Sequence, residues 1–256
     1  MQVAGRVAVV TGASSGIGAA LVRKLSERGF TCVLLARREQ RLRELATEVG
    51  GEAEVCDVAD RDAVDRVAGS VLERHPRIAL LVNNAGIPGR TTFLDGDPDR
   101  IEQVLRVNYL GSVWCLRAFL PGLEAARPSD VVNVVSVAGT VAAPSGGPYA
   151  ASKHAQLAFS RSVEPLLRRR GVRVHTLLPG PVETEGFPQR GRFGNSFLER
   201  GVIEPEDVAE HIVSMLARGR TESFVPWWYR AFGLAQAVAP GPFRRAAGRF
   251  GARRRP

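Results

Sequence analysis

The chain has few cysteines and no long apolar run, and each shortage argues against a class of protein. Its 256 residues include three cysteines, Cys32, Cys56 and Cys115, which lie far apart and lack a CxxC spacing. We therefore expect no disulfide or zinc framework and a reducing, cytoplasmic location. No window of about 18 continuous apolar residues occurs, which argues against a membrane-spanning helix. The N-terminus runs into a strand pattern without a basic and then apolar leader.

Negative charge is missing from the C-terminal end. The formal net charge is +9, but no acidic residue follows Glu222, whereas seven arginines do. Residues 1–222 therefore carry a net charge of only +2, and the basic character belongs to a tail. No recognisable nucleic-acid-binding motif accompanies that tail, so we expect no nucleic-acid partner. Lysine is scarce as well, since Lys24 and Lys153 are the only lysines among 35 basic residues.

The chain is long enough, with 45% hydrophobic residues, to bury one large core. Short apolar runs predict seven strands, at residues 6–11, 31–36, 52–56, 78–82, 130–135, 172–177 and 224–227. Amphipathic stretches between them predict helices, at residues 18–28, 39–49, 63–74, 98–120, 149–169 and 205–217. This alternation predicts an α/β protein with a doubly wound parallel seven-stranded sheet in three layers, in a single domain over residues 1–227.

A glycine-rich turn, TGASSGIG at residues 11–18, follows the first predicted strand and opens a helix. Gly12 permits the tight turn, Gly16 lets the backbone approach a phosphate, and Gly18 lets the helix pack on the strand. A pyrophosphate would then sit on free N–H groups at the positive end of the helix. The spacing is G-x-x-x-G-x-G rather than G-x-G-x-x-G. Taken alone, the motif is also compatible with an ordinary strand-to-helix turn.

Further motifs follow in a fixed order. They are NNAG at residues 83–86, Asn108, Ser136, and Tyr149 with Lys153 four residues later. Together with the turn they resemble the short-chain dehydrogenase/reductase family in its shorter, single-domain subtype, over residues 3–227. The resemblance implies a Rossmann fold that binds NAD(P), an oxidoreductase activity, and assembly as a homodimer or homotetramer.

Tyr149 and Lys153 share one face of a predicted helix because they are four residues apart. A free tyrosine has a pKa of about 10 and is a poor proton relay at neutral pH. A neighbouring ammonium group, with an oxidised nicotinamide, would favour the phenolate and lower that pKa. The resemblance implies that Tyr149 is the acid/base, that Lys153 activates it and holds the ribose, that Ser136 binds the substrate oxygen, and that Asn108 supports a relay water. Singly, each residue also has a purely structural interpretation.

The end of the second predicted strand indicates which dinucleotide binds. Ala36 stands where an NAD-preferring protein offers a carboxylate, and Arg37 and Arg38 follow at once. A guanidinium group can fork onto a 2′-phosphate, so we expect NADP(H) rather than NAD(H). The alternative is that these arginines are only solvent-exposed residues at the start of a helix. The resemblance implies a cofactor site of Gly12, Ser14, Ser15, Gly16, Ile17, Gly18, Arg37, Asp57, Asn83, Ala85, Gly86, Tyr149, Lys153, Pro179, Gly180, Val182 and Thr184. The histidines have no metal-ligand spacing, so no metal is expected.

Residues 183–203 lie where the family places its substrate lid, and 228–256 form an extension. Three phenylalanines of the lid, Phe187, Phe193 and Phe197, favour an apolar carbonyl or alcohol substrate, although loop phenylalanines also serve simple packing. Apolar residues recur at helical spacing from Trp227 to Val238, ahead of the arginines. Such a helix suits the surface of an anionic membrane, and the alternatives are an oligomer contact or a pocket cover.

The sequence thus predicts an NADP(H)-dependent oxidoreductase that interconverts a secondary alcohol and a ketone or aldehyde. It would act in the cytoplasm, with peripheral membrane contact through the tail as one option. The alternative from another class is a catalytically silent dinucleotide-binding protein with a regulatory or scaffold role.

Overall fold

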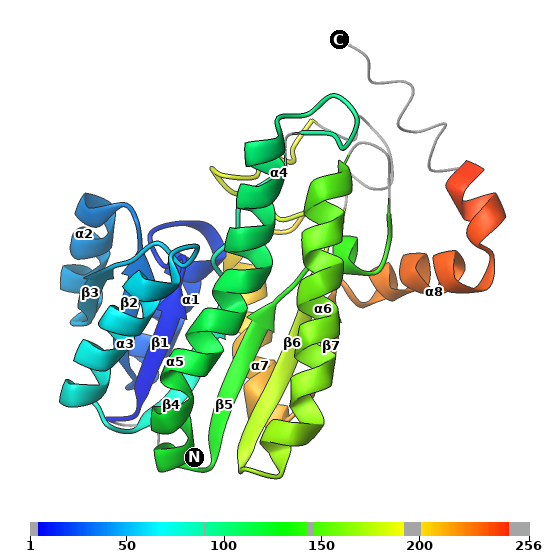
Figure 1. Cartoon of the computed structure of the whole chain (residues 1–256). Helices are drawn as coiled ribbons and strands as arrows, with labels where there is room; N and C mark the ends of the chain where they lie inside the picture. Colours follow the sequence, from blue (N-terminus) through cyan, green and yellow to red (C-terminus); the bar gives the residue numbers. More distant parts are fainter. Residues whose placement is uncertain (1–4, 90, 143–145, 192–200, 246–256) are drawn as a thin grey trace.

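The computed structural model describes residues 5–89, 91–142, 146–191 and 201–245. Its centre is a parallel sheet of seven strands in the order β3-β2-β1-β4-β5-β6-β7 (Figure 1). The strands are β1 (Val7–Thr11), β2 (Thr31–Ala36), β3 (Glu52–Val55), β4 (Ile78–Asn83), β5 (Ser129–Val134), β6 (Val172–Pro179) and β7 (Glu222–Val225). The helices are α1 (Gly16–Glu27), α2 (Glu39–Val49), α3 (Arg61–Arg74), α4 (Pro98–Leu105), α5 (Gly111–Ala126), α6 (Gly147–Arg168), α7 (Pro205–Arg218) and α8 (Arg230–Val238).

The two faces of the sheet carry separate apolar cores because side chains alternate along each strand. In β1, Ala8 and Val10 join the core under α1, α2 and α7, whereas Val7 and Val9 join the core under α3, α5 and α6. Figure 1 shows α3, α5 and α6 in front of the sheet and α7 behind it. The predicted three-layer Rossmann architecture is therefore confirmed.

In a sheet with this strand order, ligands bind in a crevice at the carboxyl edge of the sheet, which is the upper edge in Figure 1. The chain winds outward from β1 through β2 to β3, and then returns to place β4 on the other side of β1. At such a switch point the loops that follow β1 and β4 diverge, and ligands bind between them. The glycine-rich turn follows β1 and the NNAG segment ends β4, so both motifs meet at this crevice.

Most predicted elements differ from the observed ones by one or two residues at an end, and two of the differences have a clear physical reason. The helix predicted over residues 98–120 is interrupted by a π-helical turn, Arg106–Leu110, between α4 and α5. Hydrophobic periodicity cannot show one inserted residue, and π turns are frequent at functional sites. The last strand ends at Val225 rather than at residue 227, because Pro226 has no N–H to continue the ladder and a helical turn begins at Trp227.

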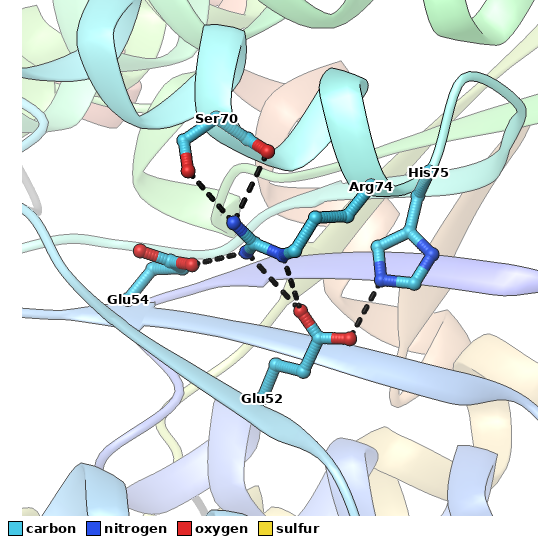
Figure 2. A network of polar contacts seen from close by, with 5 residues as sticks. All are labelled: Glu52, Glu54, Ser70, Arg74 and His75. Atoms are coloured by element: carbon cyan, nitrogen blue, oxygen red, sulfur yellow. Dashed lines mark hydrogen bonds and ion pairs between the residues drawn. The ribbon is translucent and has the colours of Figure 1, made fainter.

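Surface charges tie the edge strand β3 to the end of α3 (Figure 2). Arg74 donates from Nε to Glu52 at 3.2 Å and also pairs with Glu54. Its Nη1 donates to the Ser70 hydroxyl at 2.7 Å, and the Nε2 of His75 lies 2.6 Å from the Glu52 carboxylate. Charged side chains on an edge strand disfavour pairing with a strand of another molecule.

The segment after β7 forms a helical turn, Trp227–Tyr229, and then α8, which projects from the side of the body (Figure 1). None of the residues of α8 is buried, and Leu234 and Val238 are 65% and 76% exposed. Just before it, Trp227 is 72% exposed. Within the described ranges, none of the helices combines the length and the apolarity that a bilayer crossing requires. Residues 246–256, with four of the tail arginines, lie outside the described ranges.

Candidate active site

The glycine-rich turn is pressed against the segment that follows β4. A Cβ atom on Gly12, whose φ is +66°, would lie 2.8 Å from the Ala85 Cα, and one on Gly18 would overlap the Gly12 carbonyl oxygen. The Thr11 hydroxyl accepts the N–H groups of Asn84 and Ala85, each at 3.0 Å. The Asn84 amide in turn donates to the Thr11 carbonyl at 3.0 Å. These contacts explain why glycine is needed and hold the turn in one shape.

The start of α1 fits a phosphate group. Ser15 is the N-cap residue, but its side chain makes no cap hydrogen bond, so the first N–H groups of the helix have no such partner. A Cβ on Gly16 would lie 3.0 Å from Thr184 Cγ2, which places the segment after β6 beside the turn. A cavity of about 450 Å³ opens here, with Ser14, Gly16 and Thr184 in its wall. Uncapped N–H groups at a positive helix end suit the pyrophosphate of a dinucleotide.

Two neighbouring arginines after β2 take different partners. Arg37 lies 3.7 Å from the Asp57 carboxylate. Arg38 donates from Nε to the Ser14 hydroxyl at 3.2 Å and from Nη2 to the Ser15 hydroxyl. The structure therefore brings Arg38 to the turn. Of these two arginines, the cofactor residues predicted from the sequence included only Arg37. The double arginine was the available signal, but the sequence does not show which side chain turns inward.

A carboxylate links this arginine segment to the opposite side of the crevice. Glu185 lies 3.3 Å from Arg38 Nη1 and also pairs with Arg41. The hydrogen bond from Arg41 lowers the pKa of Glu185. Because β1, β4 and β5 lie between β2 and β6, the segment after β6 reaches across the carboxyl ends of these three strands to make the ion pairs. We call this contact of Glu185 with Arg38 and Arg41 the Glu185 bridge.

The predicted catalytic residues converge on the start of α6. The Nζ of Lys153 lies 5.9 Å from the centroid of the Tyr149 ring. Ser136 follows β5, accepts the N–H of Ala138 at 3.1 Å, and hydrogen-bonds the Tyr149 hydroxyl. The Phe187 ring lies 5.7 Å from that of Tyr149, so an apolar side chain borders the phenol.

Burial controls the ionisation of both groups. It raises the pKa of Tyr149 to about 12, against a smaller lowering by the hydrogen bond with Ser136. It lowers the pKa of Lys153, which is 3% exposed, to about 7. The expectation that the lysine lowers the pKa of the tyrosine is therefore wrong for the chain alone, because burial disfavours both charged forms. Tyr149 remains a phenol at neutral pH, which suits a proton donor.

Neutral acceptors surround the Lys153 ammonium group. Its Nζ donates to the Val134 carbonyl at 3.0 Å and to the Gln156 side-chain oxygen at 2.8 Å. Gln156 was not predicted as a site residue. A polar residue on the buried face of the helix, three positions after the lysine, was the signal in the sequence.

Asn108 lies in the π-helical turn and is completely buried. Its side-chain oxygen accepts the N–H of Ile87 at 2.8 Å, and its nitrogen donates to the Ile87 carbonyl at 3.1 Å and to the Ser152 hydroxyl at 3.0 Å. A Cβ on Gly86 would lie 3.4 Å from Asn108 Oδ1 and 3.8 Å from Lys153 Nζ. Asn108 thus fixes the NNAG segment beside the lysine.

The remaining predicted cofactor residues lie around the crevice, with one exception. Pro179 ends β6, Val182 is buried in the core under α1, α2 and α7, and Ile17 packs against the same core. The exception is Asn83, which is 2% exposed and donates to Asn133 at 2.8 Å inside the sheet. Its neighbour Asn84 faces the turn instead.

Comparison with known proteins identifies this arrangement. A family model described as short chain dehydrogenase matches residues 6–192. The chain belongs to the short-chain dehydrogenase family. It is 37% identical to 1-deoxy-11-beta-hydroxypentalenate dehydrogenase of Streptomyces exfoliatus over 238 residues, which cover 86% of this chain and 82% of the relative.

Solved structures of short-chain dehydrogenases share its fold. The enzyme from Burkholderia phymatum in complex with NAD has a TM-score of 0.83 at 27% identity, over 95% of this chain and 97% of the other. The enzyme from Burkholderia cenocepacia in complex with NADP has a TM-score of 0.80 at 29% identity, over 94% and 96%. The chain is therefore an oxidoreductase of a family whose members bind nicotinamide dinucleotides.

In this short-chain dehydrogenase the extension packs on the loops of the site. The Tyr229 ring lies so close to Gly180 that a Cβ atom at this glycine would overlap it. The same ring stacks on Trp228, with 4.0 Å between the ring centroids. On α8, the Gln236 side chain accepts the N–H of Ala142 at 2.8 Å. The inner side of the extension thus covers the segments after β5 and β6. Phe193 and Phe197 of the predicted lid lie outside the described residues.

Proposed function

We propose that the protein is an NADP(H)-dependent oxidoreductase that interconverts a secondary alcohol and a ketone or aldehyde. The observation that carries the proposal is the convergence of Ser136, Tyr149 and Lys153 beside an uncapped, glycine-lined helix start. In this proposal residues 1–227 are the catalytic domain, 183–203 its substrate lid and 228–256 an extension. When bound, the dinucleotide donates or accepts the hydride.

The side chains divide the remaining chemistry. The Ser136 hydroxyl and the Tyr149 phenol both donate to the substrate oxygen. As hydride reaches the carbonyl carbon, the oxygen gains negative charge and Tyr149 transfers its proton to it. Lys153 holds the ribose and stabilises the resulting phenolate, and Asn108 keeps the neighbouring backbone in place. Oxidation of an alcohol uses the same groups in reverse.

The preference for NADP(H) is supported by the arginines after β2. Arg38 meets the hydroxyls of Ser14 and Ser15, so a guanidinium group and two hydroxyls point into one place at the adenosine end of the crevice. Arg37 is next to Arg38 in the chain and pairs with Asp57, another of the predicted cofactor residues. This donor set suits a 2′-phosphate. NAD(H) is the alternative.

An apolar substrate is supported by the aromatic side chains near the phenol. Phe187 borders Tyr149, and the rings of Trp228, Tyr229 and Phe232 pack together where the extension covers the site. By its name, the Streptomyces relative acts on a hydroxylated compound. These features favour a lipophilic alcohol or ketone.

Turnover decides between this proposal and a silent dinucleotide-binding protein. The purified protein is incubated with NADPH and a panel of steroid, lipid and small ketones, and the absorbance of NADPH is followed. We expect consumption with at least one lipophilic ketone. Tight NADPH binding without consumption on any member of the panel would favour the regulatory or scaffold alternative.

We also propose peripheral contact with an anionic membrane through the outer side of the extension. Trp227, Leu234 and Val238 are exposed there, and the segment is free of acidic residues. Apolar side chains next to arginines suit a negatively charged interface. Leu234→Asp with Val238→Asp should abolish sedimentation with vesicles of phosphatidylcholine and phosphatidylserine, while Leu166→Asp, an exposed apolar residue on α6, should retain it. Sedimentation unaffected by the double variant would refute this contact.

The assembly and location follow the same reasoning. A homodimer or homotetramer is proposed from family membership, and analytical ultracentrifugation measures it directly. The three cysteines are buried thiols, which fits a reducing, cytoplasmic environment.

A further inference from the structure

A buried glutamine contacts the proposed catalytic lysine from the inner side. Gln156 lies one turn beyond Lys153 on α6 and has no exposed surface. Its side-chain oxygen lies 2.8 Å from Lys153 Nζ. A primary amide costs free energy when it is removed from water unless its polar atoms are hydrogen-bonded. Burying the Gln156 amide therefore costs free energy unless its hydrogen bond with Lys153 offsets that cost.

The opposite end of the amide is fixed by α5. Gln156 Nε2 donates to the Ser112 hydroxyl at 2.8 Å, and Ser112 is itself only 4% exposed. This bond makes the oxygen, rather than the NH₂ group, face Lys153. A reversed amide would set N–H donors against the ammonium donors. Helix α5 thus determines which end of Gln156 meets the lysine.

We propose that Gln156 is a positioning residue that keeps Lys153 charged and directs its ammonium group toward the crevice. Two of the three N–H donors are held from the inner side, by the Val134 carbonyl and by Gln156. The third is left for the crevice, where Gly86 passes close to Nζ. The functional part of this inference rests on the role proposed for Lys153.

The charged groups on the surrounding elements do not replace Gln156. Among the described residues Lys153 has no ion-pair partner, and Tyr149 is its titratable neighbour. Several other titratable and charged groups on the elements packed against α6 are engaged elsewhere: Glu102 with Arg106, Arg100 with the Pro88 carbonyl, Asp130 with Arg173 and His175 at the amino edge of the sheet, and His154 with the Ala150 carbonyl. Asp99 lies in the first turn of α4, and the Tyr109 ring packs on Phe159. Neutral dipoles therefore decide how much ammonium persists in this low-dielectric site.

The scarcity of lysine makes a direct test possible. In protein labelled with ¹³C,¹⁵N-lysine, NMR follows two side chains, Lys153 and the partly exposed Lys24, which pairs with Glu27 at 3.8 Å. Gln156→Met removes the acceptor at similar length and should lower the titration midpoint of Lys153 by about one pH unit. Gln156→Glu supplies a carboxylate and should raise it by about one unit or more. Lys24 should not move.

Ser160→Ala is the matched control. Ser160 is buried one turn further along α6, where it bonds Asn133 and Thr176 rather than the lysine. We expect it to lower the melting temperature without moving the Lys153 midpoint. In wild type and the two Gln156 variants, the alkaline limb of the pH profile of kcat/KM should shift in the same order as the midpoints, because activity requires the ammonium form.

An unchanged Lys153 midpoint in both Gln156 variants, with Lys24 and circular dichroism showing folded protein, would overturn the inference. If Gln156→Glu does not fold, Gln156→Asn replaces it, since it keeps the amide but withdraws it by one methylene, and the midpoint should fall as it does for Gln156→Met. Midpoints that shift as expected in a protein without turnover would support the contact and refute the proposed function instead, so the two failures are distinguishable.

Discussion

The two ends of the crevice are held by different kinds of interaction. At the adenosine end, arginines pair with Asp57 and Glu185, and the side chains involved are between 41% and 59% exposed. At the catalytic end, Lys153 is almost fully buried and its hydrogen-bond partners are neutral. Exposed pairs are weak and screened by salt, whereas buried hydrogen bonds cannot be replaced by water. The adenosine end should therefore tolerate change, and the catalytic end should not.

The largest effect is expected from removing one oxygen at the catalytic end. Tyr149→Phe deletes the proposed proton donor while keeping the ring that contacts Phe187. We expect kcat to fall by about 10²- to 10⁴-fold, since general acid catalysis contributes about this much. NADPH affinity, measured by fluorescence titration, should remain within a factor of a few. Retained turnover would show that another group delivers the proton.

An intermediate effect is expected from reversing a charge at the adenosine end. Arg38→Asp should reduce the preference for NADPH over NADH by about 10- to 100-fold, because it replaces charge-assisted donors by a carboxylate that repels the 2′-phosphate. Arg37→Asp should act in the same direction. The ratio of kcat/KM for the two cofactors measures it.

Arg43→Asp is the control for that substitution, since Arg43 lies on α2, the helix that Arg38 precedes, but pairs with Glu39. It should leave the cofactor ratio unchanged. If Arg43→Asp and Arg38→Asp changed the cofactor ratio equally, the preference would come from the overall charge of this region and not from a contact of Arg38 with the 2′-phosphate.

The smallest effect is expected from opening the Glu185 bridge. In the proposed site a 2′-phosphate would compete with the Glu185 carboxylate for Arg38, so Glu185→Gln should tighten NADPH binding by about two- to five-fold. NADH binding should change less. Glu206→Gln removes the same charge from the same cavity wall and serves as the control. Isothermal titration that finds no gain for NADPH over NADH would show that the bridge and the phosphate do not compete.

Much of this architecture follows from local sequence, and the exceptions have a common cause. The seven strands, the glycine-rich turn and the spacing from Tyr149 to Lys153 depend on neighbouring residues, so periodicity and motif order predicted them. The inward turn of Arg38, the exchange of roles between Asn83 and Asn84, and the amide of Gln156 depend on Ser15, Asn133 and Ser112, which belong to other segments. Such contacts become visible only when the chain is folded.

The packing of α8 has a practical consequence for handling the enzyme. The bond from Ala142 to Gln236 places α8 against the loop that carries the proposed substrate-binding serine. A peptide fused after α8 would follow a helix that contacts this loop, whereas β1 begins at Val7 on the opposite, amino edge of the sheet (Figure 1). Purification handles therefore belong at the N-terminus, and a loss of activity caused by C-terminal fusions would itself report on the fit of α8 over the site.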